Sequence, residues 1–211
     1  MTRIISGAAR GRRLAVPPGT STRPTSDRAR EALFSTIEAL IRSFAGARVL
    51  DLYAGSGAVG LEALSRGADH ALLVESDAGA ARTIRSNAAT TGLVGADVRA
   101  ERVELLVAGG APGSPYDVVF VDPPYDVADD AVRVVIADLL DGTWLADGAL
   151  VIVERATRGG EWRWPAGVEA DRSRRYGEAT LWYGRAARQP AEQDVQQDVQ
   201  QDSIVDTTSE R

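Results

Sequence analysis

The chain has 211 residues, of which 44% are hydrophobic, and its formal net charge at pH 7 is −6. This length and hydrophobic content predict one domain with a substantial core. The absence of cysteine excludes disulfides, cysteine nucleophiles and cysteine-ligated zinc, and a single histidine, His70, argues against a histidine metal site or triad. We therefore predict no metal site and expect chemistry based on carboxylates, hydroxyls, backbone groups and a cofactor.

The sequence has no apolar run of the roughly 18 residues that a membrane span needs, and it begins without the apolar stretch of a secretory signal. We therefore expect a soluble, cytoplasmic protein without membrane contact, and a monomer. The charge is uneven: residues 1–30 carry seven arginines and one acid, whereas residues 186–211 carry six acids and two arginines. The basic cluster is typical of a nucleic-acid-binding segment even though the net charge is negative.

Three segments follow from this distribution. Residues 1–24 mix short apolar pairs, glycines and arginines, which predicts a basic hairpin or extended arm. Residues 25–185 form the predicted domain. Residues 186–211 are polar, cannot bury a core and are expected to be disordered.

Apolar residues from position 26 onward recur on one helical face, with Ser26 or Asp27 available as the N-cap and Gly46 as the predicted end. Strands and helices then alternate. The predicted strands are 48–52, 71–75, a short one around Val98, 116–122 and 149–154, and the predicted helices are 58–65, 78–91, 103–107 and 129–140. Such alternation predicts a doubly wound, mostly parallel sheet with helices on both faces.

The end of the predicted domain differs from this alternation. Residues 168–174 and 178–183 are strand candidates without a long helix before them, which predicts an antiparallel hairpin at the sheet edge. The fold class is thus α/β, with a seven-stranded sheet.

A glycine-rich loop joins the first long strand to the helix after it. Gly55, Gly57 and Gly60 satisfy the G-x-G-x-x-G pattern, which by itself also fits a nicotinamide-dinucleotide site. Two acids favour another cofactor. Asp51, just before the loop, suits the α-ammonium of a methionine group better than a pyrophosphate, and Glu75, at the end of the next strand, offers two oxygens to ribose hydroxyls. We therefore predict an S-adenosyl-L-methionine site and a class I methyltransferase fold.

The predicted acceptor site is the tetrapeptide Asp122-Pro123-Pro124-Tyr125, which follows the strand 116–122. The prolines fix the backbone and lack N–H groups, so the carbonyls there are left as acceptors. Asp122 and the Pro123 carbonyl would accept the hydrogens of an amino group on a base, and Tyr125 would stack on the base. The pattern predicts transfer of a methyl group to an exocyclic amino nitrogen by direct in-line displacement, with Asp122 or water taking the proton late.

Beyond these two sites, the chain resembles a known family. The motifs that carry the resemblance are Arg3-Ile4-Ile5-Ser6-Gly7 with Arg10-Gly11-Arg12, Arg23-Pro24-Thr25-Ser26-Asp27-Arg28, Leu33-Phe34, the loop 51–60, Asp122-Pro123-Pro124-Tyr125 and Arg175-Tyr176-Gly177. Over residues 3 to about 184 the chain is similar to the bacterial small-subunit rRNA guanine-N2 methyltransferases. The resemblance implies that it methylates guanine N2 of 16S rRNA within a partly assembled 30S subunit.

The cofactor site departs from that family at one point. Relatives often place Asn or Asp after the third strand to meet the adenine amino group, whereas this chain has Arg102 and Val103. Backbone groups there are expected to recognise adenine. The remaining predicted cofactor residues are Tyr53, Ser76 and Asp122, and the predicted RNA-binding residues are Arg3, Arg10, Arg12, Arg13, Arg23 and Arg28.

Two alternatives stay open on the residues alone. A methyltransferase for adenine N6 or another amino acceptor would use a similar tetrapeptide, although the chain has no separate target-recognition domain. The other alternative is a non-catalytic RNA-binding assembly protein, against which the intact Asp51, Glu75 and Asp122 argue. His70 is predicted to be structural, because it lies at the opposite edge of the sheet from the ligand site.

Overall fold

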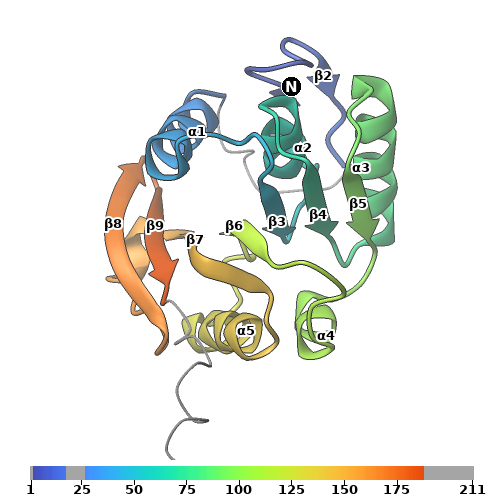
Figure 1. The fold of residues 1–211 in the computed structure, drawn as a ribbon. Coiled ribbons are helices and arrows are strands. Elements are labelled where there is room, and N and C mark those ends of the chain that lie inside the picture. Colours follow the sequence, from blue (N-terminus) through green and yellow to red (C-terminus); the bar gives the residue numbers. More distant parts are fainter. Residues whose placement is uncertain (1, 18–26, 188–211) are drawn as a thin grey trace, which may run out of the picture.

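A seven-stranded sheet forms the centre of the protein (Figure 1). The computed structural model describes residues 2–17 and 27–187. The strand order is β5-β4-β3-β6-β7-β9-β8. Its strands are β3 (Arg48–Leu52), β4 (His70–Val74), β5 (Ala96–Arg99), β6 (Tyr116–Val121), β7 (Leu145–Ala156), β8 (Val168–Tyr176) and β9 (Ala179–Ala186). β3 to β7 pair in parallel and β9 pairs antiparallel with β7 and β8, which confirms the predicted fold class.

Helices cover both faces of the sheet. The helices are α1 (Asp27–Ile41), α2 (Ala58–Ser65), α3 (Ala78–Thr91), α4 (Val103–Ala108) and α5 (Asp129–Asp141). α1, α2 and α3 pack on one face with strand residues such as Val49, and α4 and α5 pack on the other with residues such as Leu50. Alternate residues of β3 thus enter two separate cores, because successive side chains of a strand point to opposite faces. None of the helices in the described ranges is long and apolar enough to cross a membrane.

The basic N-terminal segment folds as a hairpin that is docked on the domain. β1 (Thr2–Arg3) pairs antiparallel with β2 (Arg13–Leu14), and Ile4 and Leu14 are buried in the core that α1 and α2 share. Of the two predicted forms, hairpin or extended arm, the structure therefore has the hairpin.

Polar groups of α2 hold this hairpin in place. The carboxylate of Glu62, which is completely buried, accepts the N–H groups of Ile5 and Ser6 at 2.7 and 3.0 Å. Gly7 approaches the end of α2 so closely that a Cβ atom on it would lie 1.7 Å from the Ser65 carbonyl oxygen, so only glycine fits. The hairpin is thus part of the folded domain.

Several element boundaries differ from the prediction, and the largest differences are in α1 and β7. α1 ends at Ile41 and not at Gly46, because Arg42 adopts a left-handed conformation with φ 70°. Phe44 is buried, and its ring centroid lies 5.5 Å from that of Phe34. It therefore extends the apolar pattern of the helix although it lies outside the helix. β7 is longer than the predicted strand 149–154 at both ends. The N-cap candidate Ser26 and residues 188–211 of the predicted tail lie outside the described residues.

Loss of the Glu62 carboxylate is expected to destabilise the fold. In Glu62→Ala, two N–H groups of the hairpin would lose their acceptor. The Nε of the nearly buried Arg66, which donates to Glu62 at 2.8 Å, would lose its acceptor too. We expect a loss of about 3–5 kcal/mol in the free energy of unfolding, measured by urea denaturation. Glu38→Ala is the matched control, because Glu38 binds the same guanidinium from a more exposed position and should cost less than about 1 kcal/mol. Equal effects of the two variants would contradict this account.

Candidate active site

The site lies where the strand order reverses. β3 leads to β4 and β5 on one side, whereas β6, β7, β9 and β8 lie on the other. Open parallel sheets bind ligands at such a switch point, at the carboxyl ends of the strands. Asp51 is near the end of β3 and Asp122 follows β6 directly, and the Asp122 N–H lies 3.5 Å from the Leu52 carbonyl oxygen. The fold therefore brings together the two acids that the sequence assigned to cofactor and acceptor.

Asp51 ties the glycine loop to the helix after it. Its carboxylate is 2% exposed and accepts the Gly60 N–H at 2.8 Å. Burial raises the pKa of Asp51 to about 7, the Gly60 hydrogen bond opposes the rise, and the nearby charge of Glu75 adds to it. A buried carboxylate with a raised pKa gains strongly from a cation, so the site fits an ammonium group.

Glu75 shapes the loop from the neighbouring strand. Its two carboxylate oxygens accept the N–H groups of Gly55 at 2.9 Å and Asp77 at 2.8 Å. An ionised carboxylate has about four lone-pair sites, so these bonds leave capacity for ribose hydroxyls. Gly55 has φ 57° and a Cβ on it would meet no atom within 4 Å, so the loop borders open space on the side where a cofactor would lie. These residues fit S-adenosylmethionine.

The other predicted cofactor residues line the same edge with different exposure. Tyr53 has φ 62°, and its hydroxyl donates to Glu104 at 3.2 Å. Val103 is buried at the start of α4, whereas Arg102 and Ser76 are exposed. The sequence analysis missed Glu104, which no motif marks, because its link to Tyr53 depends on how α4 packs.

The first two residues of the acceptor tetrapeptide are less exposed than Pro124 and Tyr125. Asp122 is half-buried, Pro123 is buried and Tyr125 is 56% exposed. Burial raises the pKa of Asp122 well above its ordinary value, the charges of Glu154 and Asp51 raise it further, and Arg155 opposes them. Three carboxylates therefore converge at this edge of the sheet.

Glu154 and Arg155, near the end of β7, were not predicted as site residues. Glu154 is 6% exposed, and Arg155 forms an ion pair with Asp129 at 2.8 Å and donates to the Val127 carbonyl oxygen at 2.7 Å. A signal was available, because they end the strand next to β6 and the carboxyl ends of parallel strands share one edge.

The predicted RNA-binding arginines lie mainly on the docked hairpin. Arg3, Arg10, Arg12 and Arg13 are exposed; Arg3 pairs with Asp27 at 3.1 Å and Arg12 donates to the Thr90 carbonyl oxygen at 2.9 Å. Arg28 is exposed on α1, and Arg23 lies outside the described residues. Their role in RNA binding stays a prediction.

His70 begins β4 at the opposite edge of the sheet from the acids. Its ring nitrogen lies 3.4 Å from the Tyr116 hydroxyl. Burial lowers the pKa of His70 and the charge of Arg48 lowers it further. This placement agrees with a structural role.

Comparison with known proteins gives a consistent result. Residues 2–185 match the family model described as Conserved hypothetical protein 95. Ribosomal RNA small subunit methyltransferase D of Escherichia coli (strain K12) is 40% identical over 160 residues, which cover 75% of this chain and 76% of that protein. The protein of the same name from Haemophilus influenzae is 35% identical over 161 residues, which cover 72% of this chain and 77% of that protein.

Solved structures agree. The methyltransferase yhhF from Escherichia coli matches with a TM-score of 0.76 and 38% identity, covering 89% of this chain and 99% of that one. An RNA methyltransferase from Salinibacter ruber, solved in complex with S-adenosyl-L-homocysteine, shares the fold with a TM-score of 0.59 and 17% identity over 81% of this chain and 97% of that one.

The sheet and its cluster of acids define an S-adenosylmethionine-dependent methyltransferase of the Rossmann-like class. Within that class, the chain belongs to the Conserved hypothetical protein 95 family, together with the ribosomal RNA small subunit methyltransferases D.

Removing the Asp51 charge should stabilise the protein while weakening cofactor binding. The pKa of Asp51 is about 7 in the folded state and near 3.8 when unfolded, so its destabilising effect grows from about pH 4 to pH 7 and is constant above. Asp51→Asn should therefore melt at the same temperature as wild type near pH 4 and at a higher temperature at pH 8. The gain in the free energy of unfolding at pH 8 should be on the order of a few kcal/mol.

Two measurements check this expectation. Melting curves from pH 4 to pH 8 give the stability, and calorimetric titration with S-adenosylhomocysteine should show at least a tenfold loss of affinity. Asp69→Asn is the control, because Asp69 is exposed and lies at the other edge of the sheet. A variant that kept both wild-type affinity and wild-type pH dependence would refute the role of this carboxylate.

Proposed function

We propose that the protein transfers a methyl group from S-adenosylmethionine to the exocyclic N2 of a guanine in 16S rRNA. The main observation is the position of Asp122-Pro123-Pro124-Tyr125 at the same strand edge as Asp51 and Glu75. The names of the relatives, which are ribosomal RNA small subunit methyltransferases, support rRNA as the substrate. The substrate is proposed to be a partly assembled 30S subunit, and the enzyme a cytoplasmic monomer.

The residues of the acceptor site suit an amino nucleophile. When bound, the cofactor supplies an electrophilic methyl group on a sulfonium. Asp122 and the Pro123 carbonyl would accept the hydrogens of the amino group and hold its nitrogen in line for attack. The environment that raises the pKa of Asp122 also makes it a better proton acceptor near neutral pH, so it can take the proton as the nitrogen gains positive charge.

Product analysis tests this function directly. Small-subunit rRNA from cells lacking the protein should lose one N2-methylguanine, found by mass-spectrometric mapping, and the purified enzyme should restore it. Asp122→Asn should lower the single-turnover rate by about 10²–10³-fold, because an amide cannot take the proton, while RNA affinity stays near wild type. The control is Asp126→Asn, an exposed acid four residues later. Restoration of a methyladenine, or a wild-type rate for Asp122→Asn, would refute the proposal.

The hairpin arginines are proposed to dock the rRNA. Deleting residues 1–16 would be a poor test, because it also removes buried Ile4 and Leu14 from the core. Replacing Arg10 and Arg13, which are exposed, with glutamine leaves the anchoring contacts intact.

The double variant Arg10→Gln, Arg13→Gln should bind the ribosomal substrate more weakly. The slope of log affinity against log salt concentration should become shallower by about 0.7–0.9 for each phosphate that the protein no longer neutralises. Affinity for S-adenosylhomocysteine should not change. Arg42→Gln with Arg82→Gln removes the same charge elsewhere and serves as the control. If the two double variants bound the substrate alike, the hairpin would not be the docking element.

A further inference from the structure

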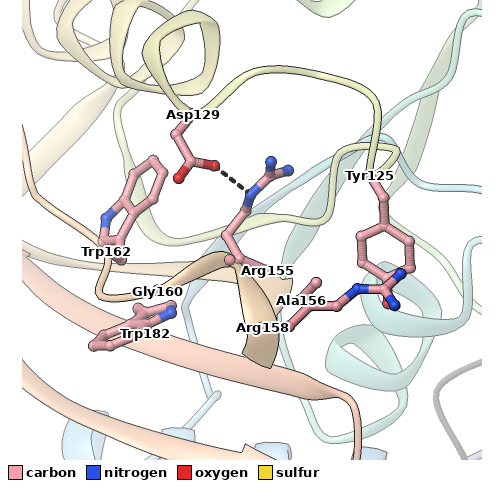
Figure 2. Close-up of a pocket in the computed structure, with 9 residues that line it drawn as sticks. Tyr125, Asp129, Arg155, Ala156, Arg158, Gly160, Trp162 and Trp182 are labelled. Carbon is pink, nitrogen blue, oxygen red and sulfur yellow. Dashed lines mark ion pairs between the residues drawn. The ribbon is translucent and has the colours of Figure 1, made fainter.

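Two adjoining pockets with shared lining residues form a trough between the acceptor tetrapeptide and the end of β7. Figure 2 shows the residues of the smaller pocket. One part, of about 230 Å³, is lined by Tyr125, Arg155, Arg158, Trp162 and Trp182, among other residues. The second part, of about 440 Å³, adds Arg175 and Glu178 and shares Tyr125 and Arg158 with the first. The smaller part alone has the volume of about eight water molecules at roughly 30 Å³ each, which is room enough for one heterocyclic base.

Two buried donors behind the smaller part of the trough lack acceptors within the described part of the chain. Trp162 is 5% exposed, and its indole N–H finds no acceptor among the residues that the structure describes. Arg155 donates from Nε to Asp129 and from one terminal nitrogen to Val127, whereas the other, Nη1, is buried and likewise has no partner in the described ranges. Buried donors without acceptors are costly. Because both nitrogens are covered by protein atoms, they lie behind the wall of the trough, and the groups that face the trough identify its ligand.

The walls of the trough identify the kind of ligand. In Figure 2, Tyr125 and Arg158 lie on one side of Arg155, and Trp162 and Trp182 lie on the other. Aromatic side chains that line a pocket suit the stacking of an unpaired base. The exposed Arg158 and Arg175 in the larger part suit phosphate, with Glu178 as its only acidic lining residue.

We infer that this trough binds the single-stranded RNA nucleotide next to the target guanine, with its base against Trp162 and Trp182 and its phosphate at Arg158 and Arg175. The inference rests on the proposed function, since Tyr125 borders the trough and is also the residue proposed to stack on the target base. Tyr125 would then stand between two bases that have been separated from each other.

Binding of a short RNA tests the trough without relying on turnover. The probe is a fluorescent single-stranded RNA of roughly ten nucleotides with one central guanine, added to the full chain saturated with S-adenosylhomocysteine. Arg158→Gln with Arg175→Gln should lower the log–log salt slope by about 0.7 for each phosphate that is no longer neutralised. Arg163→Gln, an exposed arginine that lines neither part of the trough, should keep affinity and slope within twofold of wild type.

Trp162→Phe separates ligand binding from packing. It keeps an aromatic ring but makes its stacking surface smaller, so it should weaken RNA binding about two- to tenfold. The indole N–H that it removes has no partner in the described ranges, so thermal stability should stay near the wild-type level. Trp164→Phe is the matched control, because Trp164 packs edge-on against Trp162 at 5.8 Å between ring centroids but does not line the trough. A second probe lacks the base on one side of the guanine. Removal of this base should weaken binding to wild type at least fivefold, and it should weaken binding to Trp162→Phe by a smaller factor.

The outcomes separate this inference from the proposed function. If the arginine pair and Trp162→Phe bind RNA as their controls do, or if wild type does not bind the probe at low salt, the trough is not an RNA site, even if guanine N2 is methylated. If the variants lose affinity as expected but wild type leaves rRNA guanine unmethylated, the trough stands as an RNA site and the proposed reaction fails.

Discussion

The hydrogen bond from the Gly60 N–H to the buried Asp51 carboxylate is the contact on which the site depends. It joins the end of β3 to the first turn of α2 and so fixes the glycine loop between them. One hydrogen bond does not offset full burial of a carboxylate, as the raised pKa of Asp51 shows. The remaining free-energy cost of burying the ionised Asp51 lies at the switch point of the sheet, where binding of a cationic ligand would offset it.

The same electrostatic constraint extends across the sheet to the acceptor side. Burial raises the pKa of Asp122, the charges of Glu154 and Asp51 raise it further, and the positive charge of Arg155 limits the rise. At the proposed binding site for a sulfonium and an amino group, carboxylates thus gather, and Arg155 beside them forms an ion pair with Asp129. Perturbed carboxylates that gather in one cleft are a recurring property of active sites.

The sequence predicted most of this arrangement because local signals and the fold agree. Alternating apolar runs predicted the parallel sheet, and glycine spacing with Asp51 and Glu75 predicted the cofactor edge. Phe44 misled the prediction of the end of α1, since a buried side chain after a left-handed residue looks like one more helical turn. The anchoring of the hairpin by Glu62 and the orphan donors of Trp162 and Arg155 depend on contacts between distant segments, which no local pattern encodes.

Docking of the hairpin changes how its arginines can act. An extended arm would lose conformational entropy when it binds RNA, whereas a hairpin whose backbone is held by Glu62 and Ser65 has already lost that entropy in folding. The basic residues on it are therefore preorganised relative to the strand edge that carries Asp122.

Tyr125 connects the two halves of the proposed RNA site. Its ring gains little from the protein core, because the side chain is 56% exposed. Separating two stacked bases costs a few kcal/mol, and a ring that offers one face to each base can return about 1–3 kcal/mol per stacked base. The fold holds Tyr125 after two prolines, which restrict the backbone and so keep the ring at the border between acceptor site and trough. In the proposed complex, an aromatic residue at this border would thus offset part of the cost of extracting the guanine from its stack.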